Sequence, residues 1–481
     1  MRLKKNKISF FLKTALFFFL INLGFGPCHS VEKKEDIVEA NFSLDSILKK
    51  VDNFHPKIQS SLKSQEIASA KRLEKQGGFD PKINLESDYM RYNDPTNRGD
   101  AKYATDNELS VDFLTRSGIK INPGMRYNMG SVKFPLSPTG DTGEYFVGIK
   151  LPVLRGFIVN DKSVAEKQAF IGEDLAMNDF YYTRLEVLLG AGSSYWDVLA
   201  SKTKLEVNKN LLDLAIQRAN IIQERSSKGD LPVIDATEAE QEILRRKGNI
   251  IQVERELQKN LYKLSTYLWE KDGLPSGEID PNKLSPLNED LKEFNQDDLN
   301  ESIKNAVLKR PEIQALLYEK KITDLDLRLA RNLLLPQLDF IANPGIDTGN
   351  NSIGPTFKVG ANFSFDVNRR VAKGKIQAAE LKLKKLDFDL QNIEYEVTTE
   401  VKDVVSAIKA SYYKYLNSKD ELELAKKMEI GEKQKFEYGD STLFLLNQRE
   451  RSTLEANIKL IDSIIEYNKN LLLLNAVQAS L

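Results

Sequence analysis

The fold is decided by a long stretch without proline, residues 161–227, which reads DKSVAEKQAFIGEDLAMNDFYYTRLEVLLGAGSSYWDVLASKTKLEVNKNLLDLAIQRANIIQERSS. As one helix this stretch would span roughly 100 Å, because an α-helix rises about 1.5 Å per residue. No ordinary globular core holds a helix of that length. A second proline-free stretch of similar length, residues 372–437, follows later in the chain. The two stretches therefore predict long helices that extend beyond a single compact core.

Apolar residues in the first stretch follow two neighbouring seams. One seam consists of Val207, Leu211, Leu214 and Ile221, and the other of Leu205, Leu212, Ala215, Ala219 and Ile222. Arg218 and Asn208 interrupt these seams. A two-stranded coiled coil needs only one seam. Two seams favour a helix with a neighbour on each side, as in a sheet of helices curled into a tube.

Each long stretch ends in a short turn that contains glycine. The two turns read Lys228-Gly229-Asp230-Leu231 and Tyr438-Gly439-Asp440-Ser441. Glycine permits the left-handed conformation that a tight reversal after a helix requires. We therefore predict that the chain turns back at both places, with return helices over residues 233–268 and 443–479.

Short motifs outside these helices recur along the chain. His55-Pro56-Lys57-Ile58-Gln59 is matched by Arg310-Pro311-Glu312-Ile313-Gln314, and Pro81-Lys82-Ile83-Asn84-Leu85 is matched at the same offset by Pro336-Gln337-Leu338-Asp339-Phe340. Because both pairs of motifs are separated by the same number of residues, they indicate a tandem structural repeat. We predict a first repeat over residues 31–268, a connector over residues 269–296 that is rich in Pro, Gly, Asn and Asp, and a second repeat over residues 297–481.

Each repeat is predicted to begin with a helix, over residues 44–76 and 297–334, and to continue with strands over residues 80–152 and 336–365. Apolar residues such as Ile83, Leu85 and Tyr89 alternate with polar residues in these segments. A membrane barrel strand that lines a water-filled lumen shows this alternation, and so does a soluble antiparallel sheet with one solvated face. The strands alone leave both interpretations open. A reversal near residues 113–127 predicts one extra hairpin in the first repeat, without deciding whether it joins the sheet.

The composition excludes most enzyme chemistry. The 481 residues include two histidines, His29 and His55, and a single cysteine, Cys28. This shortage excludes a His-rich zinc site, a cysteine cluster and a disulfide, and no nucleophile motif or phosphate loop is present. We therefore predict no enzyme activity, no catalytic residue, no metal site and no cofactor. The 69 basic residues nearly balance the 70 acidic ones, so the chain lacks the basic footprint of a nucleic-acid partner.

The first thirty residues are typical of a secretory signal. A basic start is followed by an apolar run from Phe10 to Leu23 and by small residues that suit cleavage before Val31. The alternative is a lipoprotein in which Cys28 is retained and acylated. After Val31 no uncharged run reaches the length of a membrane helix, so any membrane contact must be made by strands or by a surface face.

The sequence as a whole resembles the outer membrane factors, the TolC-like export channels of double-membraned bacteria. The resemblance rests on the tandem halves, on the order helix, strands, long helix, turn and return helix, and on the paired His55-Pro56 and Arg310-Pro311 sites. It also rests on three stretches, LPVLRG at residues 151–156, SYWDVL at residues 194–199 and GDSTLFLLNQRE at residues 439–450. Their order and spacing cover nearly all of the chain after the signal.

This resemblance implies an α+β membrane protein, a homotrimer whose outer-membrane β-barrel is continuous with a long α-helical tunnel in the periplasm. Such a protein lies in the cell outer membrane, in contact with its lipid, and is a passive duct for efflux or type I secretion. A periplasmic adaptor (membrane fusion) protein connects it to an inner-membrane pump of RND or ABC type. The alternative is a periplasm-spanning structural or surface-adhesion protein that keeps this architecture and exports nothing.

The resemblance also implies where the adaptor makes contact. The expected residues are those of the two tip turns, Lys228, Gly229, Asp230, Leu231, Tyr438, Gly439, Asp440 and Ser441. The alternative is that these glycines only close the helical hairpins.

A constriction is expected close to these turns. In the best-known members, carboxylates six and nine residues after the second-turn glycine form an acidic ring, but here those positions hold Leu445 and Gln448. The same count from Gly229 gives Asp235 and Glu238, which are candidates for a carboxylate ring or residues of a solvated helix face. Phe444 and Leu445 are the candidates for an apolar constriction.

Overall fold

The computed structural model describes residues 42–93, 99, 101–132, 138–277, 279–294 and 299–481. The predicted signal over residues 1–30, including Cys28, lies outside the described residues. All elements named below belong to one unit, Asn41–Leu481.

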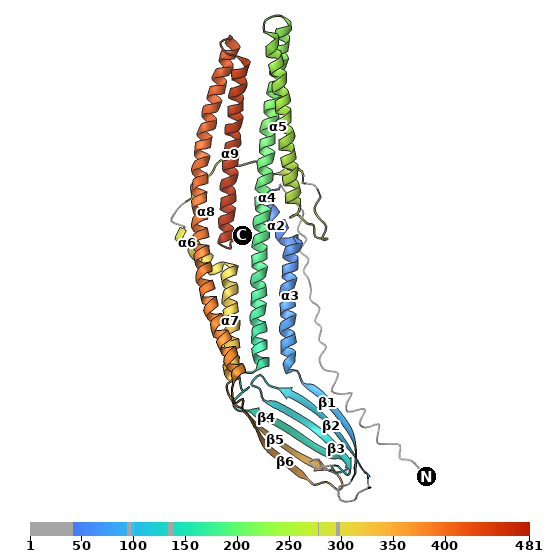
Figure 1. Ribbon diagram of the computed structural model, residues 1–481. Helices are drawn as coiled ribbons and strands as arrows, with labels where there is room; N and C mark the ends of the chain where they lie inside the picture. The colour runs from blue at the N-terminus through green and yellow to red at the C-terminus, as the bar shows by residue number, and fades with distance from the viewer. Residues whose placement is uncertain (1–41, 94–98, 100, 133–137, 278, 295–298) are drawn as a thin grey trace, which may run out of the picture. The chain divides into compact units, whose positions relative to one another are not determined.

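Two long helices dominate this unit (Figure 1). Helix α4 (Asp161–Ser227) has 67 residues and α8 (Arg370–Tyr438) has 69. Each packs along the return helix that follows it, α4 against α5 (Val233–Ser265) and α8 against α9 (Leu443–Val477). A capping box of Asn160 and Ser163 fixes the start of α4, where the Asn160 side chain accepts from the Ser163 N–H at 2.9 Å.

The predicted helices over residues 44–76 and 297–334 are each two helices, which corrects the sequence analysis. The first consists of α2 (Leu44–Phe54) and α3 (Pro56–Gln76), and the second of α6 (Leu299–Lys309) and α7 (Pro311–Asn332). The breaks fall at His55 and Arg310, whose ψ angles are 126° and 125°. A proline forces the residue before it out of the helical region, so each X-Pro pair ends one helix and starts the next.

The strands form one antiparallel sheet whose six strands are arranged in chain order. They are β1 (Lys82–Asn93), β2 (Ala101–Leu114), β3 (Lys120–Gly130), β4 (Gly143–Pro152), β5 (Gln337–Thr348) and β6 (Pro355–Ser364). The extra hairpin joins this sheet, because Leu109 of β2 pairs with Met125 of β3. Among the described strands, β1 and β6 each pair on one side only, so the sheet of this single chain does not close on itself.

The two faces of the sheet differ in chemistry. One face carries large apolar side chains that are exposed to solvent, such as Leu85 on β1 with 77% of its surface exposed and Phe363 on β6 with 67%. On the other face Arg126 bonds Glu108 at 2.8 Å and Glu144 at 3.4 Å. A soluble antiparallel sheet normally covers its apolar face with a core. This sheet leaves that face uncovered within the chain.

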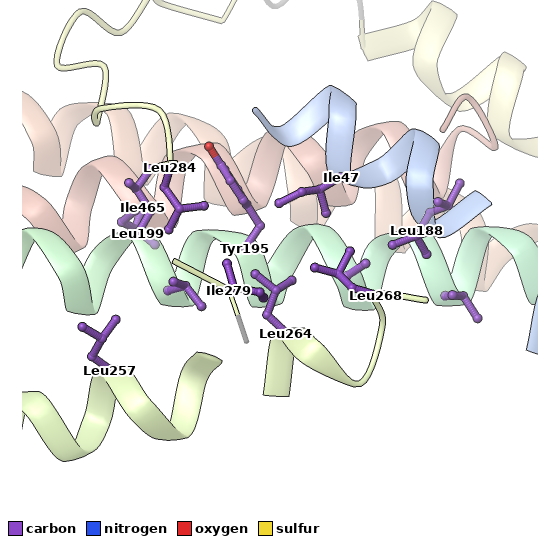
Figure 2. Close-up of a cluster of buried hydrophobic side chains, with 14 of the residues drawn as sticks. Ile47, Leu188, Tyr195, Leu199, Leu257, Leu264, Leu268, Ile279, Leu284 and Ile465 are labelled. Atoms are coloured by element: carbon purple, nitrogen blue, oxygen red, sulfur yellow. The ribbon is translucent and has the colours of Figure 1, made fainter. Parts of the chain in front are cut away.

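The largest apolar core lies where α2, α4, α5 and α9 meet the connector, and Figure 2 shows its side chains pointing toward one another. Its most deeply buried members include Ile47, Leu199, Leu264 and Leu268. Ile279 and Leu284 of the connector pack into the same core, beside the short 3-10 helix η2 (Pro281–Lys283). The connector is therefore anchored to the long helices.

The same order of elements, a broken helix, strands, a long helix and a return helix, occurs twice along the chain. That this order arose by duplication stays a prediction. Within the described part of the chain, none of the helices combines the length and the apolar character needed to cross a membrane.

Candidate functional site

The two hairpin tips share one backbone geometry. Gly229 and Gly439 are left-handed, with φ angles of +83° and +85°. The N–H of Asp230 donates to the Arg225 carbonyl at 2.9 Å, and the N–H of Asp440 donates to the Lys435 carbonyl, also at 2.9 Å. The glycine N–H groups donate to Ser226 and Phe436. These paired bonds define a Schellman motif, which satisfies the last carbonyls of α4 and α8 and reverses the chain.

Most of the predicted tip residues are exposed. Lys228, Gly229, Asp230, Gly439 and Asp440 are exposed, and 84% of the Tyr438 surface is open. Leu231 is half-buried against an apolar cluster that includes Ile222. The Ser441 hydroxyl donates to the Glu432 carboxylate. Leu231 and Ser441 therefore hold the turns together, and the other six predicted residues are available to a partner.

Sequence reasoning missed two apolar residues beside the first turn. Val233 and Ile234 begin α5 and are 75% and 68% exposed. Phe444 and Leu445, at the start of α9, are 55% and 41% exposed. Large apolar side chains in the open commonly mark a contact surface. The sequence did contain a signal for this surface: two apolar residues, Val233 and Ile234, directly follow Pro232 at the start of a predicted helix.

The predicted constriction residues do not form one group. Glu238 is half-buried and accepts a hydrogen bond from the Asn447 amide of α9 at 3.4 Å. Asp235 lies nearly one turn earlier on α5 and is also half-buried. Phe444 and Leu445 are on α9, between the buried Leu443 and Leu446. The structure thus places Glu238 against Asn447 of the second hairpin, and among the described residues no hydrogen bond or ion pair joins two of the four candidates.

A buried ionic network lies deeper between the hairpins. Glu450 of α9, with 4% of its side chain exposed, accepts hydrogen bonds from Arg218 of α4 and Arg246 of α5. The Arg246 guanidinium also donates to Glu242 at 2.8 Å and to the Leu211 carbonyl at 2.6 Å. One carboxylate of the second hairpin therefore binds both helices of the first.

The electrostatics of this network follow from its burial. The pKa of the Arg218 guanidinium is lowered to about 10, mainly by burial and to a smaller extent by the charge of Arg246. Arg218 is therefore still cationic at neutral pH. The Asn447 amide oxygen accepts a further bond from Arg218 at 3.1 Å. Removing one partner from a buried ion pair leaves an uncompensated charge, which costs far more than loss of an exposed pair. The network therefore ties the hairpin α4–α5 to α9.

The described residues contain no group of three or more His, Cys, Asp or Glu side chains placed to hold a metal ion. The tips form a surface of exposed turns and apolar side chains, and the buried ionic network around Glu450 connects the two hairpins below it.

Comparisons with known proteins bear on the fold. Neither a protein-family model nor a curated protein sequence matches the chain. Solved structures do match. The outer membrane channel CmeC of Campylobacter jejuni has a TM-score of 0.64 and 15% sequence identity, over 94% of this chain and 90% of that one. The outer membrane protein VceC of Vibrio cholerae has a TM-score of 0.64 and 11% identity, over 90% of this chain and 96% of that one.

A third match is the open state of the MtrE outer membrane channel of Neisseria gonorrhoeae, with a TM-score of 0.62 and 11% identity, over 91% of this chain and 88% of that one. The chain has the fold of these outer membrane channels. At these identities the likeness shows the fold alone, and the matches run over nearly the whole chain. At this coverage, the matched residues include parts of both the sheet and the two hairpins.

Proposed function

We propose that this protein is the outer-membrane duct of a three-part export system. In this proposal it is a homotrimer in the cell outer membrane, with its helices forming a tunnel through the periplasm. The observation that carries the proposal is the sheet, which has an uncovered apolar face and two unpaired edges on the fold of outer membrane channels.

The unpaired edges support assembly from several copies. Unsatisfied backbone N–H and C=O groups are not tolerated in the hydrocarbon core of a membrane. Pairing β6 of one copy with β1 of the next would satisfy them, and three copies would then close one shared barrel. Its apolar face would contact outer-membrane lipid, and its charged face would line the water-filled passage.

Exposed apolar residues on the helices support the same assembly. Leu381, Phe388 and Tyr395 recur every seven residues on α8 and are 56%, 69% and 73% exposed. Leu244 and Ile251 on α5 are 64% and 67% exposed, also at a spacing of seven. This is the spacing at which helices pack side by side. Neighbouring copies would cover these faces and extend the layer of helices into a tube.

The proposed duct performs no bond chemistry. It supplies a continuous aqueous path for efflux or type I secretion, and the energy comes from an inner-membrane pump of RND or ABC type. A periplasmic adaptor links the two and docks on the exposed tip residues, together with Val233 and Ile234. We place the constriction at Asp235 and Glu238, with Phe444 and Leu445 as the apolar alternative.

Cross-linking at the tip tests this proposal. Asp230→Cys places a thiol on an exposed turn, in a chain whose one cysteine, Cys28, lies in the predicted signal. A bifunctional thiol reagent in living cells should join the tip to a single periplasmic adaptor, which mass spectrometry identifies. The matched control Lys271→Cys lies on an exposed part of the connector, away from both tips, and should capture no adaptor.

Conductance of the purified protein in a planar lipid bilayer gives the second measurement. A trimer that conducts ions and captures an adaptor supports the proposal in full. A trimer that conducts but captures nothing at Asp230→Cys contradicts the placement of the adaptor site at the tips. A protein that assembles and never conducts contradicts the duct, and then the structural or adhesion role is favoured.

A further inference from the structure

A groove of about 1000 Å³ lies on the helices between the sheet and the largest apolar core, the one that contains Ile47 and Leu199. Its lining comes from α3, α4, α7 and α8, and includes Arg72, Lys167, Leu317 and Asp387. The proposed role as a duct assigns no task to it.

The position of the groove follows from the packing of these helices. They are neighbours in the order α3, α4, α7, α8, and Figure 1 shows them side by side as one layer. Arg72 belongs to α3 and Asp387 to α8, which are the two outermost helices, and yet both line the same groove. Side chains from both edges of a layer converge only on its concave side. When copies close this layer into a tube, the concave side faces the passage.

Part of the groove wall is apolar. Its apolar residues are Phe170 and Ile171 of α4, Leu317 and Leu325 of α7, and Leu383 of α8. Half of the Phe170 surface is exposed, and the Arg72 guanidinium lies 4.7 Å from the centre of its ring. Such a wall accepts a flat or fused-ring hydrocarbon skeleton, because aromatic side chains contribute a large contact area.

The charges in the groove do not balance. Its carboxylates are all paired with arginine or lysine: Glu166 with Arg116 at 2.7 Å, Asp324 with Arg328 at 2.8 Å, and Asp387 with Lys320. Lys167 and Lys321 are exposed and form no ion pair with any described carboxylate. The Lys321 ammonium instead lies 5.0 Å from the centre of the Tyr318 ring. The groove therefore carries positive charge that no ion pair neutralises, next to an apolar wall.

We propose that this groove is a contact site for amphipathic organic anions as they pass through the duct. Lys167 and Lys321 bind the anionic group, and the apolar wall binds the hydrocarbon skeleton. The inference rests on the proposed function, because the groove faces the passage only in the closed assembly. It adds to that function a preferred class of cargo, which is organic, partly apolar and negatively charged.

The test uses the assembled full chain in nanodiscs of zwitterionic phospholipid, with empty nanodiscs as the blank. The probe is anilinonaphthalene sulfonate, and its uncharged partner is phenylnaphthylamine, which has the same ring skeleton without the sulfonate. Lys167→Glu combined with Lys321→Glu should weaken binding of the sulfonate about tenfold, which corresponds to about 1.4 kcal/mol. Binding of phenylnaphthylamine should not change.

Two further variants control for charge and folding. Lys271→Glu reverses an exposed charge in the connector, outside the groove lining, and should leave the binding of both probes unchanged. Lys167→Gln combined with Lys321→Gln removes the same two charges without adding carboxylates, and should weaken sulfonate binding in the same direction by a smaller factor. Equal sulfonate affinity in the wild type and in both double variants would overturn the inference.

Conductance separates this inference from the proposed function. The sulfonate should reduce the current through the wild-type channel, and the Lys→Glu double variant should need about tenfold more of it for the same reduction, in line with the change in affinity. A channel that conducts but responds equally in both proteins overturns the groove and leaves the duct intact. A protein that conducts in no preparation overturns the duct, and with it the place of the groove in a passage.

Discussion

At the scale of single residues, Glu450 has the largest predicted effect on stability, because one buried carboxylate binds Arg218 and Arg246. We expect Glu450→Gln to lower the free energy of unfolding by about 3 to 5 kcal/mol, since it leaves the Arg218 guanidinium without its carboxylate and the buried Arg246 with Glu242 alone. Denaturant unfolding followed by the helical circular dichroism signal measures this loss. Glu423→Gln is the matched control: its pair with Lys427 is 66% exposed on both sides, so solvent screens it and its loss should barely change stability. Equal midpoints for the two variants would contradict the prediction.

His55 gives the protein a dependence on pH. Its imidazole accepts the Lys57 N–H at 3.2 Å at the start of α3, and its pKa is lowered from 6.5 first by burial and then by the Lys57 charge. The unfolded chain therefore binds a proton at higher pH than the folded chain. The contribution of His55 to stability is complete above pH 6.5 and is lost as the pH falls through the lower folded pKa.

The variant His55→Asn isolates this effect. Asparagine caps a helix without titrating, so the loss of stability on acidification should be smaller in the variant than in the wild type. The measurement compares the unfolding midpoints of both proteins from about pH 7.5 to about pH 5, a range that spans the ordinary histidine pKa. If the two curves run parallel through this range, His55 is not the group responsible.

At the scale of elements, the reversal at the end of α8 depends on the backbone of Gly439. Its φ angle is +85°, and an added Cβ would meet no atom within 4 Å, so only the conformation opposes a side chain. We expect Gly439→Ala to destabilise the protein by about 1 to 2 kcal/mol. Gly431→Ala, eight residues earlier inside the same helix and equally open, should stabilise it by about 0.5 to 1 kcal/mol. Opposite shifts in melting temperature for these two variants check the prediction, and shifts of the same sign would refute it.

The elements also show which features could be predicted from the sequence. The range expected for the first long helix, residues 161–227, is that of α4, because proline-free apolar seams and a terminal glycine are local signals. The X-Pro pairs at His55 and Arg310 did not lead to a prediction of helix breaks, because the apolar pattern continues across both pairs. The partners of Arg218 were beyond reach, because Glu450 lies 232 positions away. The interruption of an apolar seam by Arg218 was the only local sign of that network.

At the scale of the whole molecule, the uncovered apolar face of the sheet makes a prediction about the membrane. Leu85 is 77% exposed on this face, and the next residue, Glu86, points to the opposite, charged face beside Glu108. If lipid covers the first face, Leu85→Arg should cost up to about 2 to 4 kcal/mol, which is the cost of an arginine at the bilayer midplane. Glu86→Arg should cost little, because the new side chain would lie opposite Glu108 on the charged face.

Stability of the assembled protein in lipid, measured by heating and gel electrophoresis of the intact oligomer, compares these two variants. A large loss for Leu85→Arg with little change for Glu86→Arg is the expected result. Equal losses would mean that the two faces have similar surroundings, which contradicts a lipid-covered face. The alternating pattern alone left a soluble sheet open, since periodicity reports that two faces differ without reporting what covers either one.

The continuous course of α4 and α8 restricts how proteins of this kind can change in length during evolution. Inserting one residue into α4 rotates everything beyond it by about 100°, which would turn Arg218, Ala215 and Ile222 away from their partners, and the same holds for the buried residues of α8. Seven residues restore the original face with a shift of about 20°. Length changes should therefore be accepted in steps of about seven, and they should arise together in α4, α5, α8 and α9. If the helices cross the periplasm as proposed, periplasms of different width would select among a small set of permitted lengths.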